Sequence, residues 1–489
     1  MRGNVASFAS ACIVLLASRS TIALGEEINH TKSTNSEQSN NCVVISGIDI
    51  DSIDTVMELA VNSASQQAAD FLGASAKDLY IGSKRFFYPQ IGFTFSGNNM
   101  KEKAWSSTFY DLPKKGIYEQ SETYPGYWTN TPILQLTQNV LDLSQMATIS
   151  QNFFGAKASI FSAIANAQSS ALNAANYLVS YVTQSYMVKA SMTLASIYKK
   201  QYEDSKLLYA AGEASKIDLL NAKQQYISYL ASIKTAQALK DGFHSDLNAV
   251  TNSVVCDYEP GKEGFSLIDQ LPGLQKTIDM QSKAVSLSPL VNSYFSSATQ
   301  YSKQALSYDL SYLPTVSFSF GATGTYEYGN IAGVSQPSSE YDNTADLYAQ
   351  MNVTWNFDGG QNLSMASSAR NQSSSYKQNA LQEVISVSDQ YNTSVEQDSQ
   401  WRESVEGYKK ALELQSEVMN LNLIGYRAGF LNYTDVQTQA NALFSNYNSY
   451  YSSVRSFMSN RLTYQSLFLY EDYPVTNKRI TEIKASFDL

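Results

Sequence analysis

Four short segments of the chain alternate apolar and polar side chains with a period of two. This pattern predicts β-strands whose two faces meet different surroundings. The segments cover residues 88–97, 128–141, 313–322 and 345–357. In each, one face carries aliphatic and aromatic side chains and the other mainly Thr, Ser, Asn and Gln. The strands come in two pairs, and we expect polar loops, around residues 98–127 and 322–345, to join the members of each pair.

A long stretch with helical periodicity follows each pair of strands. After Asp142, apolar or small residues recur at steps of three and four: Ile149, Phe153, Ala156, Ile160, Ala163, Ala167, Ala171, Ala174, Leu178 and Val182. This spacing is typical of helices that pack as coiled coils. The stretch after Gly360 repeats it less cleanly. We expect each long helix to end at a glycine turn, followed by a second helix that runs back.

The two halves of the chain contain the same motif. Tyr209-Ala-Ala-Gly212-x5-Asp218 returns as Tyr426-Arg-Ala-Gly429-x5-Asp435, shifted by 217 residues. An Asp ends the preceding strand in both halves, 70 residues before the first turn glycine and 71 before the second. A continuous helix of that length spans about 100 Å, roughly three times a bilayer core. The equal lengths indicate a structural ruler that was duplicated.

The duplication divides the chain into segments. The N-terminus has an early arginine, a short apolar core over 8–17 and small residues around 23–25, as secretory signals do. No later stretch approaches 18 uninterrupted apolar residues. The predicted segments are a signal peptide (1–25), a disordered leader (26–47), a first structural repeat (48–255), a linker (256–275), a second structural repeat (276–470) and a C-terminal tail (471–489).

Composition narrows the class of protein. The formal net charge is −10, so nucleic acid is not an expected partner, because neutralising phosphates needs a basic surface. Charged residues make up only 16% of the chain, below the roughly 25% usual for soluble domains. A polar but weakly charged chain suits a protein with both wet and lipid-facing surfaces.

Two cysteines, Cys42 and Cys256, would remain after removal of the signal peptide. In an oxidising compartment they could form a disulfide. The sequence leaves two unpaired thiols as an equal alternative.

The predicted strands are too few to close a membrane barrel in one subunit. Barrels that span membranes need about eight strands or more, because an open edge leaves backbone groups unpaired in lipid. Three copies would provide twelve strands and an aqueous lumen lined by the small polar residues. The alternative is a soluble sandwich, which would not require two helices of about 100 Å.

The order of these features resembles the TolC-like outer-membrane efflux proteins. The resemblance covers nearly the whole mature chain and depends on the two turn motifs and on two strand-to-helix junctions, Gln138–Asp142 and Trp355–Gly360. It implies a mainly α fold with a β portion: a trimeric 12-stranded outer-membrane β-barrel, with four strands from each chain, continued by a long α-helical barrel across the periplasm.

The resemblance also implies function and partners. The chain would be the exit duct of a tripartite efflux or type I secretion system, and would conduct substrates passively. It would form a homotrimer in outer-membrane lipid and dock a periplasmic adaptor and an inner-membrane transporter of the RND, ABC or MFS class. Whether the cargo is a drug, a metal or a secreted protein stays open.

The same resemblance implies a gate at the inner end of the helical barrel, formed by Asp218, Tyr426 and Asp435. Rings of carboxylates around a narrow pore favour cations. The alternative is that both aspartates only stabilise the first turn of a helix. Many family members have an Arg where this chain has Leu431, and Thr438 replaces a second acidic position, so we expect packing by Leu431 and Phe430 to contribute to closure.

The glycine turns match the adaptor-contacting tips of the family, at Gly212 and Glu213 and at Gly429 and Phe430. An ordinary glycine helix stop explains the glycines equally well.

The chain offers little for catalysis. Its histidines are His30, in the leader, and His244, late in a predicted helix. Gly359-Gly360 follows a strand but completes no dinucleotide-binding fingerprint. We predict no enzymatic activity, cofactor or metal site. A coiled-coil surface protein or adhesin is the alternative function, although it would not explain the duplicated strand pairs.

Overall fold

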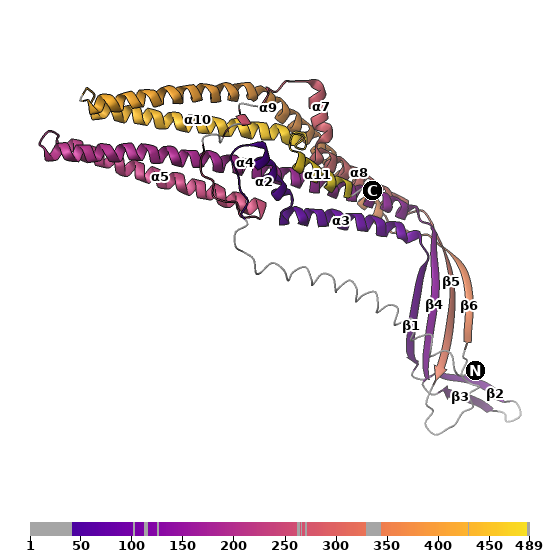
Figure 1. The fold of residues 1–489 in the computed structure, drawn as a ribbon. Helices are drawn as coiled ribbons and strands as arrows, with labels where there is room; N and C mark the ends of the chain where they lie inside the picture. Colours follow the sequence, from indigo (N-terminus) through magenta and orange to yellow (C-terminus); the bar gives the residue numbers. More distant parts are fainter. Residues whose placement is uncertain are drawn as a thin grey trace.

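The computed structural model describes residues 42–100, 103–111, 116–124, 127–261, 265, 267–268, 271–328, 344–428 and 430–486. A sheet lies at one end of an elongated molecule, and two helical hairpins extend from the middle to the other end (Figure 1). The chain enters the sheet twice and returns from it twice. The predicted signal peptide and the predicted leader up to residue 41 lie outside the described residues.

The four predicted strands form one antiparallel sheet in the order β1-β4-β5-β6. Their bounds are Gln90–Met100 for β1, Tyr127–Leu141 for β4, Thr315–Tyr328 for β5 and Thr344–Thr354 for β6. Strand β4 of the first repeat pairs with β5 of the second, so the two repeats share one sheet. Among the described residues, strands β1 and β6 each have one neighbour in this sheet, so both of its outer edges are open.

The prediction of a loop over residues 98–127 was wrong. Strands β2 (Lys103–Asp111) and β3 (Gly116–Tyr124) form a separate antiparallel hairpin there, at the end of the sheet farthest from the helices (Figure 1). Strand β5 likewise runs to Tyr328, inside the second expected loop. Ser, Thr, Tyr and Gln side chains tolerate the extended backbone, so polarity alone did not indicate a loop here.

The two long helices are unbroken, as their periodicity predicts. Helix α4 (Leu143–Ala210) has 68 residues and α9 (Gln361–Arg427) has 67. The return helices are α5 (Lys216–Thr251) and α10 (Tyr433–Leu467). The hairpins α4–α5 and α9–α10 extend in the same direction and end in two turns at one end of the molecule (Figure 1).

Carboxylates fix the start of each long helix. The side chain of Asp142 accepts a hydrogen bond from the amide of Gln145 at 2.8 Å, which caps α4. The carboxylate of Asp358 accepts from the amides of Gly360 and Asn362 and from the Tyr312 hydroxyl. Gly359 and Gly360 have φ values of 66° and 97°. Residues with a Cβ rarely adopt that backbone, so the second junction needs its glycine pair.

Shorter helices surround the middle of the molecule: α2 (Ile50–Val61), α3 (Ala64–Lys84), the 3₁₀ turn η1 (Arg85–Phe87), α7 (Ile278–Leu287), α8 (Pro289–Leu310) and α11 (Pro474–Ser486). The largest buried apolar cluster lies here and joins α2, α4, α10 and α11. In the described part of the chain, none of the helices is both long enough and apolar enough to cross a membrane.

Two terminal segments are more ordered than the sequence indicated. Residues 42–47 were assigned to a disordered leader, yet Val43 pairs in parallel with Val255, beyond the end of α5. The predicted C-terminal tail contains helix α11, which buries Ile480 and Ile483 in the main cluster. Both segments depend on partners more than 200 residues away in sequence, which local patterns do not reveal.

Candidate functional site

The sheet has one apolar face along all four strands. The register places Ile91 beside Leu136, Leu136 beside Phe320, and Phe320 beside Ala349. Two residues along, the next row is Phe93, Leu134, Ala322 and Leu347. The large side chains of both rows are solvent-exposed in the single chain, up to 89% for Leu347. A contiguous exposed apolar surface of this kind requires lipid or another protein to cover it.

The opposite face of the sheet is polar or small. One row consists of Gln90, Thr137, Ser319 and Gln350, and the next of Gly92, Gln135, Gly321 and Tyr348. A Cβ on Gly321 would lie 2.5 Å from the ring of Tyr348, so only glycine leaves room for that ring across the strand pair. The sheet therefore has one apolar face and one face that is polar or small.

Aromatic residues lie just beyond the strands at the end of the sheet nearest the helices. Tyr88, Trp355 and Phe357 are all exposed. The indole of Trp355 donates to the carbonyl of Tyr312 at 2.7 Å and packs against Phe357. An apolar body with a satisfied polar edge suits the boundary between hydrocarbon and water.

The two tip turns contain the same type of backbone hydrogen bond. The amide of Glu213 donates to the carbonyl of Leu208, and the amide of Phe430 donates to the carbonyl of Gly425, both at 2.9 Å. Each bond spans five residues and ends its helix as a Schellman motif does. Gly212 has a φ of 78°, which favours glycine. Gly429 lies outside the described residues. Glu213 and Phe430 are exposed, Phe430 by 86%.

Both predicted gate aspartates close a capping box. The Asp218 amide donates to the Ser215 hydroxyl at 3.1 Å, and the Asp218 carboxylate accepts from the Ser215 amide at 3.2 Å. Asp435 and Asn432 exchange the equivalent bonds at 2.9 and 3.1 Å. The capping alternative therefore holds within one chain. It leaves the negative charges in place beside the tips, so a role in a gate stays a proposal.

Tyr426 and Leu431 are bound within their own subunit. The Tyr426 hydroxyl pairs with Ser205 of α4, and burial, together with the charge of Asp204, raises the Tyr426 pKa. In the described chain no bond joins Tyr426 to Asp218. A Cβ on Gly425 would lie 2.8 Å from Leu431, so Leu431 packs over Gly425 in the second turn. Of the two residues expected to pack at the tip, Leu431 is engaged and Phe430 is free to meet another molecule.

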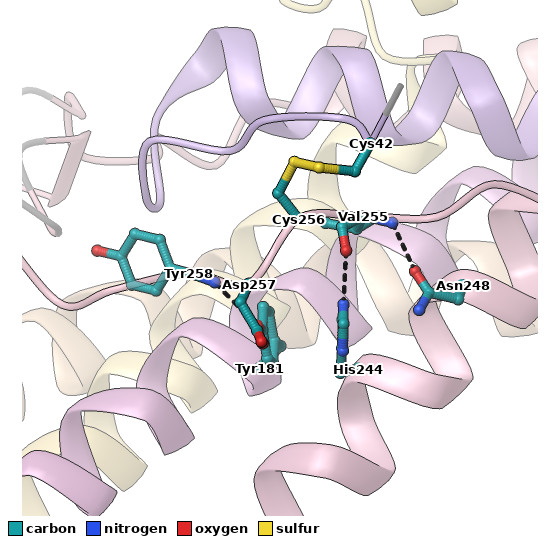
Figure 2. Close-up of a disulfide and its surroundings, with 8 residues drawn as sticks. All are labelled: Cys42, Tyr181, His244, Asn248, Val255, Cys256, Asp257 and Tyr258. Carbon is teal, nitrogen blue, oxygen red and sulfur yellow. Dashed lines mark hydrogen bonds between the residues drawn. A yellow bond between two sulfur atoms is a disulfide. The ribbon is translucent and has the colours of Figure 1, made fainter. Parts of the chain in front are cut away.

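Cys42 and Cys256 form a disulfide, with Cα atoms 5.0 Å apart (Figure 2). The Cys256 amide donates to the Val43 carbonyl, and the Val43 amide donates to the Val254 carbonyl, each at 2.9 Å. The bond joins residues separated by 214 positions and so encloses the first structural repeat. The alternative of two unpaired thiols does not occur in this structure.

Side chains of α4 and α5 hold the segment on both sides of Cys256 (Figure 2). His244 Nε2 donates to the Val255 carbonyl at 2.8 Å, and its ring stacks on Tyr181. The Tyr181 hydroxyl donates to Asp257 at 3.2 Å and accepts from the Tyr258 amide at 3.0 Å. Burial raises the Tyr181 pKa to about 12, whereas Lys240 lowers the pKa of Asp257. His244 thus has a structural role.

A buried ion pair ties the linker to the second hairpin, and sequence reasoning missed it. Arg461 Nη2 donates to Asp398 Oδ2 at 2.9 Å. Asp398 also accepts from the Leu274 amide, while Arg402 donates to the Leu271 carbonyl. Burial lowers the Arg461 pKa, and the charge of Asp398 opposes this. The three charged side chains satisfy the backbone of a linker that has no regular secondary structure of its own there.

A two-faced sheet with open edges, joined to helical hairpins of about 100 Å, defines the class of fold found in outer-membrane channels. No protein-family model matches the sequence, and a comparison with curated protein sequences finds no match.

Solved structures with this fold include the CmeC outer membrane channel of Campylobacter jejuni, at 14% identity and a TM-score of 0.68 over 93% of this chain and 95% of that chain. The outer membrane protein VceC of Vibrio cholerae matches at 13% identity and 0.64, over 85% of this chain and 95% of that chain. The open state of the Neisseria gonorrhoeae MtrE outer membrane channel matches at 13% and 0.64, over 85% and 88%.

At these identities the comparisons establish the fold. The chain has the mainly helical, duplicated architecture with a β portion that the sequence resemblance to TolC-like proteins predicts.

Proposed function

We propose that the chain is one subunit of a passive outer-membrane channel that crosses the membrane as a trimeric β-barrel and continues through the periplasm as a helical barrel. The observation that carries the proposal is the four-stranded sheet: apolar and exposed on one face, polar on the other, and open at β1 and β6. Strand edges in lipid must be paired, so β1 of one copy would pair with β6 of the next. Three copies close twelve strands.

The helical body supports the same assembly. Exposed apolar side chains lie along α9, whose main helix contacts among the described residues are with α7, α8 and α10. A second exposed set lies on α3 and α5. Such unlike flanks suit a head-to-tail ring, in which each copy covers the next. The side chains are Leu363, Leu381, Ile385, Leu414, Leu421 and Ile424 on α9, and Phe71, Leu72, Leu79, Ile217, Leu220 and Ile227 on α3 and α5.

The tips of the hairpins would form the inner end of the duct. In a ring of three, Asp218 and Asp435 would each occur three times around the narrow end, which favours cations. Exposed Glu213 and Phe430 would contact a periplasmic adaptor, which connects the duct to an inner-membrane RND, ABC or MFS transporter. In this assembly the chain acts as the exit duct of a tripartite efflux or type I secretion system and has no catalytic step.

The test is to purify the cleaved chain in detergent, measure its mass by sedimentation, and reconstitute it in a planar bilayer. We expect a trimer that conducts ions with a preference for cations. A soluble, elongated monomer or dimer that gives no conductance would refute the proposal and favour a structural coiled-coil protein or adhesin. Cross-linking from a photoreactive group at position 213 or 430 to a co-expressed adaptor tests the docking step, with position 239 on α5 as the control.

A further inference from the structure

The contact between the two helical hairpins combines apolar and polar side chains near the tips. Helix α4 meets α10 along this seam, whose apolar part includes Leu194, Val436, Ala440 and Leu443. Between them, the Tyr198 and Tyr229 hydroxyls both donate to Asn441, at 3.3 and 2.7 Å. Two turns nearer the tip than Tyr198 along α4, Ser205 pairs with Tyr426. Polar groups inside this seam are therefore generally satisfied.

Gln201 is the exception near the tip. Its residue is 2% exposed, and neither its Nε2 nor its Oε1 has a hydrogen-bond partner among the described residues. It follows Tyr198 by three positions and precedes Ser205 by four, so all three lie on one face of α4. Buried amides are normally bonded, and an unsatisfied one opposes the packing that encloses it.

We propose that Gln201 is a positioning residue for gating, which keeps the seam between the hairpins weakly stabilised near the tips. Closing the seam removes water from the amide and supplies no replacement bond. Separating the hairpins restores those bonds, so the group favours the open arrangement. The inference rests on the proposed channel function, because it assumes that the two hairpins of a subunit move apart when the duct opens.

The test compares Gln201→Met with the natural residue, because Met has a similar volume and no amide. Ala440, fully buried in the seam, is replaced by Cys in both proteins. Cys42 and Cys256 are in a disulfide and Cys12 lies in the predicted signal peptide, so in the cleaved protein a thiol reagent reports seam opening at this position. We expect Gln201→Met to slow labelling about tenfold and to lower the open fraction in bilayers by a similar factor.

Ser191→Ala is the matched control. Ser191 is also fully buried on α4 with no hydrogen-bond partner for its hydroxyl in the described chain, but it lies ten residues farther from the tip. We expect labelling at position 440 to stay within about twofold of the natural rate. An unchanged or faster rate in Gln201→Met, or an equal slowing in Ser191→Ala, overturns the inference. If labelling is slower in Gln201→Met but the natural protein does not conduct ions, the role of Gln201 in weakening the seam is supported and the proposed channel function is refuted.

Discussion

The long helices α4 and α9 have nearly the same length, 68 and 67 residues, but opposite environments. Helix α4 is enclosed by α2, α3, α5, α8, α10 and α11, and most of its central third is buried. Helix α9 contacts mainly α7, α8 and α10, and buries single residues at intervals along its length, such as Ala366, Tyr391 and Met419. The duplicated ruler has become an inner helix in one repeat and an edge helix in the other.

This difference indicates that α4 contributes mainly to folding of the subunit and α9 to its assembly with other copies. An inner helix is stabilised by its own subunit, so its apolar pattern is dense. An edge helix with exposed Leu and Ile at helical spacing is stabilised fully only when another molecule covers it. The edge position of α9 explains why its apolar pattern in the sequence is less regular than that of α4. The difference in position also predicts that the two helices respond differently to the same substitution.

The largest expected effect is that of a charge placed on each helix. Leu178→Asp, at a fully buried site on α4, should prevent folding, because an unpaired buried carboxylate costs about 4 kcal/mol or more. Leu381→Asp, at a 49% exposed site on α9, should leave helix content unchanged and disrupt the trimer. Circular dichroism measures helix content, and sedimentation in detergent measures trimer formation. Gln378→Asp, at an exposed polar position, is the control; a normal Leu381→Asp trimer would contradict the edge-helix argument.

The next effect concerns the buried charge of α9. Asp398→Asn should destabilise the subunit by about 3–5 kcal/mol, because it leaves the Arg461 guanidinium buried without its counter-charge. Asp398→Leu combined with Arg461→Met should cost less than either single change, since no charge then remains buried. Urea denaturation of Asp398→Asn, of the single variants Asp398→Leu and Arg461→Met, and of the double variant measures this. A double variant as unstable as the sum of the singles would show that the linker bonds, and not the charge pair, dominate.

The disulfide encloses the first repeat, and we expect it to stabilise that repeat and not the second. A closed loop of this length corresponds to about 5 kcal/mol in the chain-entropy model, and measured values are commonly 2–4 kcal/mol. Cys42→Ser with Cys256→Ser should therefore lower the melting temperature and expose residues 253–261 to proteases first. A reducing agent should lower the melting temperature of the natural protein and leave the double variant unchanged. Equal stability of both proteins would refute this.

The smallest expected effect distinguishes capping from gating at the tips. Asn432→Ala removes the cap and keeps the charge of Asp435, whereas Asp435→Asn keeps a hydrogen-bond acceptor and removes the charge. We expect Asn432→Ala to cost about 1 kcal/mol and to leave cation preference unchanged. Asp435→Asn should shift the reversal potential in asymmetric salt toward zero, which is the value for a pore without ion selectivity. If the potential stays constant, Asp435 is only a cap; Asp218→Asn repeats the test in the first repeat.

Parts of the candidate site were predictable because they depend on local pattern. The four strands followed from alternation, and both turns followed from a glycine after a helical run. The capping partners Ser215 and Asn432 were also readable, three residues before each aspartate. The β2–β3 hairpin was missed because polar residues occupy both of its faces, so no alternation marks it. Arg461 and Gln201 gave no signal, because a buried polar residue looks like an exposed one until its neighbours are known.

The sequence by itself determined the periods, the helix lengths and the duplication, since these depend on neighbours within a few positions along the chain. The tertiary structure alone decided which long helix is the inner one, whether Cys42 and Cys256 form a disulfide, and which buried amide has no hydrogen-bond partner among the described residues. Those outcomes depend on residues hundreds of positions apart meeting in space, and no local pattern of hydrophobic and polar side chains encodes which of them meet.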